Sequence, residues 1–147
     1  MTRKELLAFM RSERFAAQAS VSGSHAPQAA VVGIAVSDDF EIVFDTLHSS
    51  RKAANLRANP SIAFVIGGMH DRGIRTVQYE GIADTPSGDE LIRVREIYFE
   101  VFPDGRERLT WPEIIHVRVK PTWVRYSSYA PTPPLVLEFD AKALRAL

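Results

Sequence analysis

The residues of this chain best suited to binding chemistry are two serines followed by two cations: Ser49, Ser50, Arg51 and Lys52. They follow a β-type run and precede a helical stretch. That stretch must end before Pro60, because a residue that precedes proline is disfavoured in helical geometry. The first turn of a helix offers free N–H groups and the positive end of the helix dipole to an anion. Arginine can grip phosphate at two points, lysine adds a mobile charge, and the serine hydroxyls can donate. The segment therefore predicts a phosphate site, with an exposed helix start and two solvated cations as the alternative.

An apolar run precedes this segment. Residues 29–36 are apolar at every position, so both faces of the strand that they predict are apolar. Such a strand is buried on both sides, or has something other than protein packed on it. A flat apolar ring needs a floor of this kind, and backbone groups of residues 30–33 can hydrogen-bond to its polar edge. We expect a strand over residues 28–37 to form a hairpin with a strand over residues 41–45, which places this floor beside the phosphate site.

The elements that position these residues are mostly strands. Alternating patterns predict strands over residues 15–21, 28–37, 41–45, 61–67, 75–84, 113–120 and 122–126, the last two separated by Pro121. Helical spacing predicts helices over residues 2–12, from Ser49 or Ser50 to residue 57, and over residues 87–100. The first and the last of these begin with capping-box spacing, at Thr2 and Glu5 and at Ser87 and Glu90. We expect a polar loop over residues 67–73, an exposed loop over residues 103–108, and a short tail in which Asp140 can cap a final helical turn. This order predicts a mainly β fold, a β-barrel of six or more mostly antiparallel strands with a few short helices, in a single domain over residues 1–147.

Composition excludes several classes of protein. The 147 residues suit one domain, and the absence of cysteine excludes disulfides, a thiolate zinc site and a cysteine nucleophile. Cysteine absence also suits a reducing cytoplasm, where we expect the protein. Lys plus Arg (18) balance Asp plus Glu (18), so we expect no nucleic-acid partner. No apolar run reaches the roughly 20 residues that span a bilayer, and the four histidines form no metal-type pair and no triad, so we expect neither a membrane segment nor a metal site.

In combination these features resemble the pyridoxamine 5'-phosphate oxidase-like group of FMN-binding split β-barrel proteins. The resemblance runs from about residue 27 to residue 84, and more faintly to residue 126. It is carried by the apolar strand 29–36, Phe44-Asp45-Thr46, Ser50-Arg51-Lys52, Asn55-Leu56, Asn59-Pro60 and Glu80-Gly81. Each of these features is weak alone, and their order and spacing make the pattern specific.

The resemblance implies a homodimer that holds two FMN molecules at its interface. In such proteins the phosphate lies on the residues that Arg51 and Lys52 match, in the turn of Ser50. The ring lies along the matching strand and is lined by further residues; the positions here are Ala30, Val31, Val32, Gly33, Asp45 and Thr46. Either Thr76 or Gln78, which face the same side of a strand, takes the role of a glutamine contributed by the second subunit. Trp111 either packs on the barrel rim or stacks near the ring.

The C-terminal part departs from the oxidases proper. Those end in an Arg-Leu-His type segment that grips the vitamin B6 substrate, whereas residues 135–140 here are mainly apolar and a short tail follows. Vitamin B6 oxidation is therefore not expected, and the resemblance implies an FMN-dependent oxidoreductase for another small molecule. No side chain stands out as catalytic, since a flavin itself performs the electron chemistry. The alternatives are a deazaflavin (F420)-dependent reductase of the same fold, a non-catalytic flavin-binding or sensing module, and a barrel without cofactor. A haem-binding branch of the fold would need a histidine ligand, for which His48 is the candidate.

Overall fold

The protein is described here by a computed structural model, over residues 1–68 and 74–147. Most of the loop predicted over residues 67–73, with His70, lies outside the described residues. The strands are β1 (Phe15–Val21), β2 (Pro27–Gly33), β3 (Ala35–Val36), β4 (Ile42–Leu47), β5 (Ser61–Gly67), β6 (Arg75–Asp84), β7 (Ile114–Ser128) and β8 (Leu135–Asp140). The helices are α1 (Arg3–Ser12), α2 (Arg51–Ala58), α3 (Gly88–Val101) and α4 (Ala141–Ala146), with a 3-10 helix, η1, over Pro103–Thr110.

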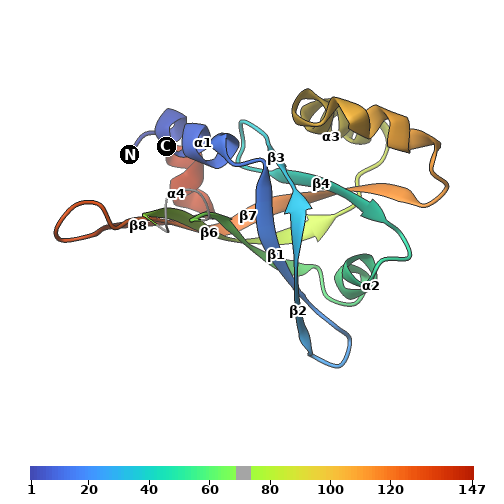
Figure 1. Cartoon of the computed structure of the whole chain (residues 1–147), viewed down its shortest axis with the longest axis horizontal. Coiled ribbons are helices and arrows are strands. Elements are labelled where there is room, and N and C mark those ends of the chain that lie inside the picture. The colour runs from blue at the N-terminus through green and yellow to red at the C-terminus, as the bar shows by residue number, and fades with distance from the viewer. Residues whose placement is uncertain (69–73) are drawn as a thin grey trace.

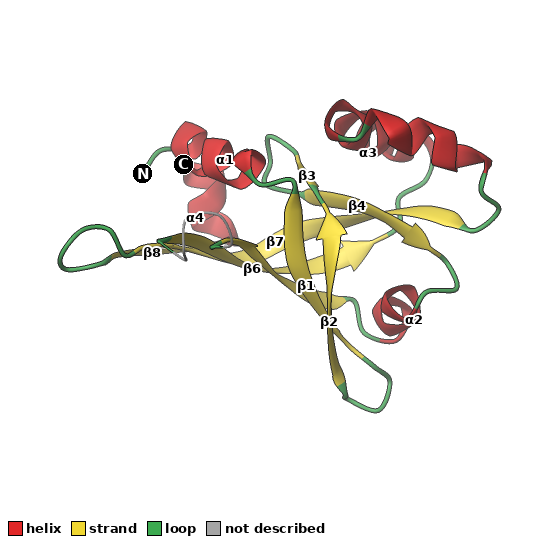
Figure 2. Ribbon diagram, viewed as in Figure 1, coloured by secondary structure: helices red, strands yellow, loops and turns green. Residues whose placement is uncertain are grey.

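The strands form one curled antiparallel sheet (Figures 1 and 2). Their order is β2-β1-β5-β6-β7-β4-β3, and β8 pairs with β7. The two ends of this order, β2 and β3, are consecutive in the chain and are separated only by Ile34. The sheet must therefore curl until its two ends meet, and the gap between them is the split of the barrel. This arrangement confirms the predicted mainly β split barrel.

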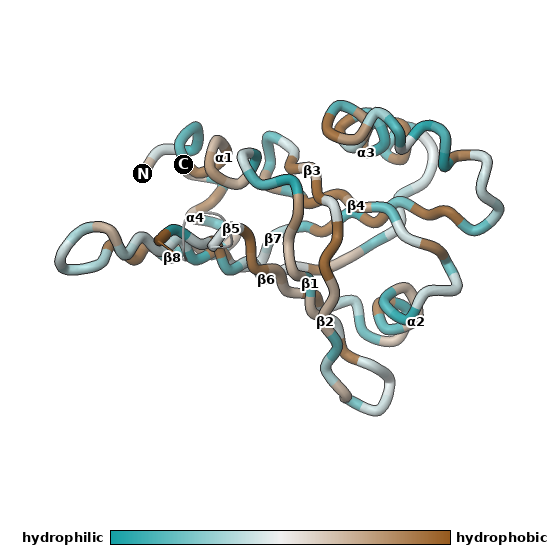
Figure 3. Tube along the Cα trace, viewed as in Figure 1, coloured by the Kyte–Doolittle hydropathy of each residue, from teal (hydrophilic) through white to brown (hydrophobic). Residues whose placement is uncertain are grey.

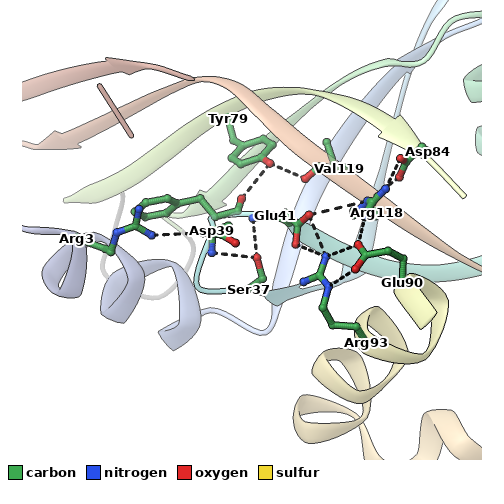
Figure 4. A network of polar contacts seen from close by, with 11 residues as sticks. Arg3, Ser37, Asp39, Glu41, Tyr79, Asp84, Glu90, Arg93, Arg118 and Val119 are labelled. Atoms are coloured by element: carbon green, nitrogen blue, oxygen red, sulfur yellow. Dashed lines mark hydrogen bonds and ion pairs between the residues drawn. The ribbon is translucent and has the colours of Figure 1, made fainter. Parts of the chain in front are cut away.

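The barrel interior is filled by inward-facing aromatic and branched side chains. Phe44, Phe64 and Tyr79 come from three different strands, and the Phe64 ring contacts the other two edge to face, with centroids 6.1 Å from Phe44 and 5.8 Å from Tyr79. The Tyr79 hydroxyl lies 3.1 Å from the Phe40 carbonyl oxygen and 2.9 Å from that of Val119 (Figure 4). A buried phenol thus has polar partners, and the packing fixes how the opposite walls of the barrel meet.

The predicted strand over residues 28–37 is two strands. Residues 27–33 pair with β1, and only Ala35 and Val36 form the predicted hairpin with β4. The Ile34 N–H still donates to the Arg14 carbonyl at 2.9 Å, one pair beyond Gly33–Phe15, and the chain then crosses to β4. One continuous strand would have kept residues 27–33 and residues 35–36 on the same side of the split. The predicted strand over residues 28–37 was therefore wrong in its length, and most of it does not pair with β4 as predicted.

Pro121 does not separate two strands as predicted. β7 runs unbroken through it, and its partner β6 shifts register between Glu80 and Gly81 to accommodate it. A proline has no N–H for the ladder, so a bulge at this position removes the mismatch.

The C-terminal tail and the loop after α3 are more ordered than predicted. Residues 135–140 form strand β8 on β7, and the expected final helical turn is α4, where Asp140 accepts from the Ala143 N–H at 2.7 Å. Residues 103–110 form η1 rather than an open loop. The capping box predicted before α3 is absent, because the Ser87 hydroxyl makes no capping bond and Glu90 contacts arginines instead. The box at Thr2 and Glu5 of α1 is present.

The helices lie around the barrel in three places (Figure 1). α1 and α4 lie close together at one end, near both chain termini. α3 covers β3 and β4 through a second apolar cluster of Ala35, Val43, Val94, Tyr98, Phe99 and Phe102. α2 lies beside β1 and β2, bonded to them through Asn55. Among the described residues, no helix has the length and apolar character required to cross a membrane.

Candidate functional site

The turn before α2 is built by serine hydroxyls. Ser50 is the N-cap, since its Oγ accepts from the Ala53 N–H at 3.2 Å, and it also lies 3.0 Å from the Thr46 hydroxyl. Ser49 instead donates to Glu113 at 2.7 Å. Both hydroxyls are therefore engaged in shaping the turn, and the free donors of the helix start are backbone N–H groups and cations.

Two cations occupy the first two positions of α2. Arg51 is exposed and Lys52 is half-buried, and the first turn contains no acidic residue. The other long helices follow the opposite rule: α1 has Glu5 in its first turn, and α3 has Asp89 and Glu90. Cations at the positive end of a helix dipole are unfavourable unless an anion joins them. A local departure of this kind is typical of a binding site.

Arg51 reaches from α2 to β2. With the amide oxygen of Gln28 turned toward the guanidinium, that oxygen lies 2.7 Å from Arg51 Nε, 2.6 Å from Nη2 and 3.1 Å from Nη1. With Gln28 in this orientation the Asn55 amide must turn as well, because an amide nitrogen cannot accept a hydrogen bond. The Asn55 oxygen then accepts from the Gln28 amide nitrogen at 2.6 Å and from the Ser20 hydroxyl at 3.0 Å. Sequence analysis missed Gln28 as a site residue. The contact depends on the fold bringing the β1–β2 hairpin against α2, and no local pattern signals it.

The apolar strand predicted to carry a flat ring lies next to this turn. In β2, Ala29, Ala30 and Val31 are exposed, whereas Val32 is buried and Gly33 is half-buried. Among the described strands β2 pairs only with β1, so its other edge has no strand partner. Part of the strand is brown, the colour of apolar residues, in Figure 3. An apolar strand exposed on both faces fits the predicted second case, a surface on which another molecule packs.

Asp45 and Thr46 point to opposite sides of β4, as neighbours in a strand do. Thr46 faces Ser50 and the phosphate turn. The Asp45 carboxylate faces α3 and η1, where it accepts from the Tyr98 hydroxyl at 3.0 Å and from Arg108 Nε at 2.7 Å. The structure therefore brings Thr46 to the turn, and it leaves the Asp45 carboxylate committed to internal partners.

A buried histidine lies beside Asp45 on this second face. His116 pairs with Asp45 across β4 and β7 and lies under the rings of Tyr98 and Phe99. Burial, with the charge of Arg95 nearby, lowers the pKa of His116 to about 4. The ring is therefore neutral near pH 7, and its Nε2 is buried without a hydrogen-bond partner. Across the described parts of the chain, no cluster of three or more His, Asp or Glu could hold a metal ion.

Two of the three further predicted residues lie away from α2. Thr76 and Gln78 share the outer face of β6, and two strands, β5 and β1, separate them from β2. At about 4.8 Å per strand step, that is roughly 14 Å, so one chain does not bring them to the phosphate turn. Trp111 is half exposed at the end of η1, and its carbonyl accepts from Ile114 at the start of β7.

The outer face of the sheet between β2 and β7 is apolar and slightly hollow. Small side chains there, together with Val65, Gln78 and Trp123, line a depression of about 250 Å³. On the other side of α2 lies a separate groove of about 410 Å³. Its floor is apolar (Ala53, Leu56, Ala83, Ile115 and Val117), and its rim includes His48 and Arg57.

Solved structures share this fold at low sequence identity. A haem-binding protein from Mycobacterium smegmatis matches with a TM-score of 0.81 and 18% identity, over 99% of this chain and 61% of that one. An FMN-binding pyridoxamine 5'-phosphate oxidase-related protein from Nostoc punctiforme matches with a TM-score of 0.70 and 14% identity, over 93% of this chain and 87% of that one. The haem storage protein HutZ from Vibrio cholerae matches with a TM-score of 0.69 and 16% identity, over 80% and 88%. The chain thus spans about three fifths of the first of these proteins.

Sequence comparison is more specific than these structural matches. No curated protein matches the chain. The sequence profile of the pyridoxamine 5'-phosphate oxidase family, however, matches residues 2–128, which include every element from α1 to the end of β7. The chain belongs to the pyridoxamine 5'-phosphate oxidase family.

Proposed function

We propose that the protein is an FMN-binding oxidoreductase, with the flavin held at a homodimer interface and a small molecule other than vitamin B6 as substrate. The observation that carries this proposal is the pair of cations at the start of α2, beside an apolar strand exposed on both faces. Family membership supports the choice of a flavin phosphate as the anion.

The donor set fits a phosphate ester attached to a flat ring. Arg51, Lys52 and the free N–H groups of the first turn would hold the phosphate, in a turn that Ser50 and Thr46 shape. The exposed part of β2 would support the ring, with its unpaired edge offering backbone groups to the polar side. When bound, FMN supplies two-electron chemistry, and the protein supplies position and electrostatics.

A second subunit would complete the site. Phe15, Val31 and Val65 lie on one face of β1, β2 and β5 and are 59%, 61% and 45% exposed. An apolar patch on a folded chain marks an interaction surface. Thr76 and Gln78 lie on the continuation of this face, so a partner packed there would bring its own copies toward β2. The dimer proposal thus gives those two residues a role that one chain alone does not.

The test is the absorption spectrum of the purified protein, followed by titration with FMN. The proposal expects the two flavin bands at about 450 and 370 nm, and an FMN affinity that is at least about tenfold weaker in Arg51→Ala. The matched control is Arg57→Ala, which removes a cation of the same helix that bonds to the His48 carbonyl. A colourless protein that takes up no FMN would exclude the proposal.

Turnover separates an enzyme from a flavin-binding module. Reduction of a dye acceptor by NADH or NADPH in the presence of bound flavin supports an oxidoreductase. A protein that holds FMN and shows no turnover with any donor would be the sensing module. A single band near ~420 nm in place of the two FMN bands would identify deazaflavin (F420).

Haem is the second candidate, and the groove behind α2 favours it. Its floor is apolar, His48 stands at its rim as a possible iron ligand, and Arg57 could pair with a carboxylate. Two proteins of the same fold are haem-binding or haem-storing. A Soret band on titration with haemin, lost in His48→Ala and retained in Arg51→Ala, would support this candidate over FMN.

A further inference from the structure

A neutral side chain fixes the proposed phosphate-binding arginine. Arg51 is a long exposed side chain on the first turn of α2, and such a side chain loses rotamer entropy when it is held in place. The Gln28 oxygen lies near all three nitrogens of the Arg51 guanidinium, at 2.7 Å from Nε, 3.1 Å from Nη1 and 2.6 Å from Nη2. A guanidinium carries five N–H groups and one amide oxygen has two lone pairs, so the remaining N–H groups can meet a ligand.

Gln28 is itself held from the barrel interior. Its amide bonds to Asn55, which is 6% exposed, and Asn55 contacts the hydroxyl of Ser20, which is 2% exposed. Asn55 lies one helical turn after Arg51 and therefore on the same face of α2. The chain of contacts runs from a buried strand through a buried amide to the exposed guanidinium, so each member limits the rotamers of the next.

The chemistry of Gln28 matters as much as its place. A carboxylate there would also hold Arg51, but it would cancel the positive charge and repel an incoming phosphate. An amide oxygen accepts the same hydrogen bonds and leaves the charge of the guanidinium intact. A neutral hydrogen-bond acceptor such as Gln28 can therefore orient Arg51 and leave its charge available to an anion.

We propose that Gln28, held by Asn55 and Ser20, is a positioning residue that presents Arg51 to the phosphate of the cofactor. This inference rests on the proposed function, because it takes the phosphate ester of FMN as the ligand of Arg51. An Arg51 side chain that is already oriented loses less conformational entropy when the phosphate binds. The contacts from Ser20 through Asn55 to Gln28 therefore strengthen phosphate binding without touching the ring.

The experiment compares FMN with riboflavin, which has the same ring and no phosphate, by titration of the full-length protein. Gln28→Ala is expected to weaken FMN binding about tenfold and to change riboflavin binding by less than about twofold. Gln28→Met, which keeps the length and lacks the amide, replaces it if Gln28→Ala does not fold. Gln28→Glu is expected to weaken FMN binding more than Gln28→Ala, since it adds a charge that opposes the phosphate.

A double-mutant cycle separates positioning from a general structural role. In the Arg51→Ala background, Gln28→Ala should change FMN affinity by less than about twofold, because the residue that it positions is gone. Equal losses in both backgrounds, equal losses for FMN and riboflavin, or tighter FMN binding in Gln28→Ala would overturn the inference. The last result would mean that Gln28 competes with the phosphate for Arg51.

Failure of the proposed function gives a different result. A wild-type protein that binds neither FMN nor riboflavin overturns the proposed function, and the positioning role falls with it. A wild-type protein that prefers FMN to riboflavin, with variants at Gln28 that keep the same preference, overturns the positioning role alone.

Discussion

At the scale of single residues, Gly81 allows β6 and β7 to stay paired across Pro121. A Cβ at Gly81 would lie 2.5 Å from the Lys120 carbonyl oxygen and 2.6 Å from Val119 Cγ1, closer than real contacts allow. We expect Gly81→Ala to lower the free energy of unfolding by about 2–3 kcal/mol, because the two strands must separate locally to admit the methyl group. Urea unfolding measures this loss. Gly23→Ala is the control, since a Cβ there meets nothing within 4 Å, and equal stability of the two variants would contradict the argument.

His116 gives the folded protein a specific sensitivity to acid. Its pKa is lowered to about 4, by burial first and then by the charge of Arg95, whereas a histidine in an unfolded chain titrates near ~6.5. Between these values the unfolded state binds a proton that the folded state does not, so stability is full above pH ~6.5 and falls as the pH drops toward 4. The groups that face His116 are Asp45 on β4, Arg95 and Tyr98 on α3, and Arg108 on η1.

The expected contribution is on the order of 1–3 kcal/mol, lost over this pH range. Thermal unfolding followed at steps of pH from 7.5 to 4 should show a shallower decline in His116→Leu than in the wild type. His25→Gln, at an exposed turn, should decline as the wild type does. A His116→Leu variant with the same pH profile as the wild type would place the acid sensitivity elsewhere.

At the scale of elements, an ion network ties α3 to the sheet (Figure 4). Arg118 of β7 contacts Asp84 and Glu90, each at 2.5 Å, and Arg93 of α3 contacts Glu41 at 2.9 Å. The side chains of Glu41 and Arg118 are both only 9% exposed, and they lie 3.9 Å apart. The charges of Glu41 and Arg118 are partly removed from water, which costs free energy unless oppositely charged partners offset it.

We expect Arg118→Leu to lower the free energy of unfolding by about 2–4 kcal/mol, because it leaves Glu41 buried beside one arginine instead of two. Adding Glu41→Gln should recover part of the loss, since the uncompensated charge is then gone. The measurement is urea unfolding of the wild type, the single variant and the double variant. Arg106→Leu, which breaks an ion pair with both partners more than half exposed, is the control and should cost less than about 1 kcal/mol. Recovery that is absent in the double variant would show that Arg118 acts through packing alone.

Sequence analysis predicted the elements that have local signals. The helix at residue 50, the strands β1, β5 and β6 and the final capped turn follow from caps, alternation and proline, and the structure confirms them. The break at Ile34 has no such signal, because it is set by the closure of the barrel. β8 carried a short signal, since residues 137–140 alternate between apolar and acidic side chains, and the proline-rich stretch before it hid the pattern. The Gln28–Arg51 contact joins two separate elements, and only the assembled fold could show it.

At the scale of the whole molecule, the outer face of β2, β1 and β5 decides whether one chain is enough for the proposed site. Val31 lies near the centre of that face. Ala17 of β1 pairs with Val31 of β2 on one side and with Val65 of β5 on the other, so the three residues form one row across the strands. It is 61% exposed, so replacing it perturbs the isolated chain little. A charge there would be buried without a partner if a second copy packed on the face.

We therefore expect the wild type to be a dimer by light scattering, and Val31→Glu to be a folded monomer with a melting temperature within about 4 °C of the wild type. The same variant should lose most FMN affinity, because in the proposed dimer it is the partner subunit that brings Thr76 and Gln78 to β2. Ile92→Glu is the matched control: Ile92 is 60% exposed on α3, away from this face, and its variant should remain dimeric and bind FMN normally. A monomeric Val31→Glu that binds FMN as the wild type does would mean that one chain builds the whole site, and that Thr76 and Gln78 have no part in it.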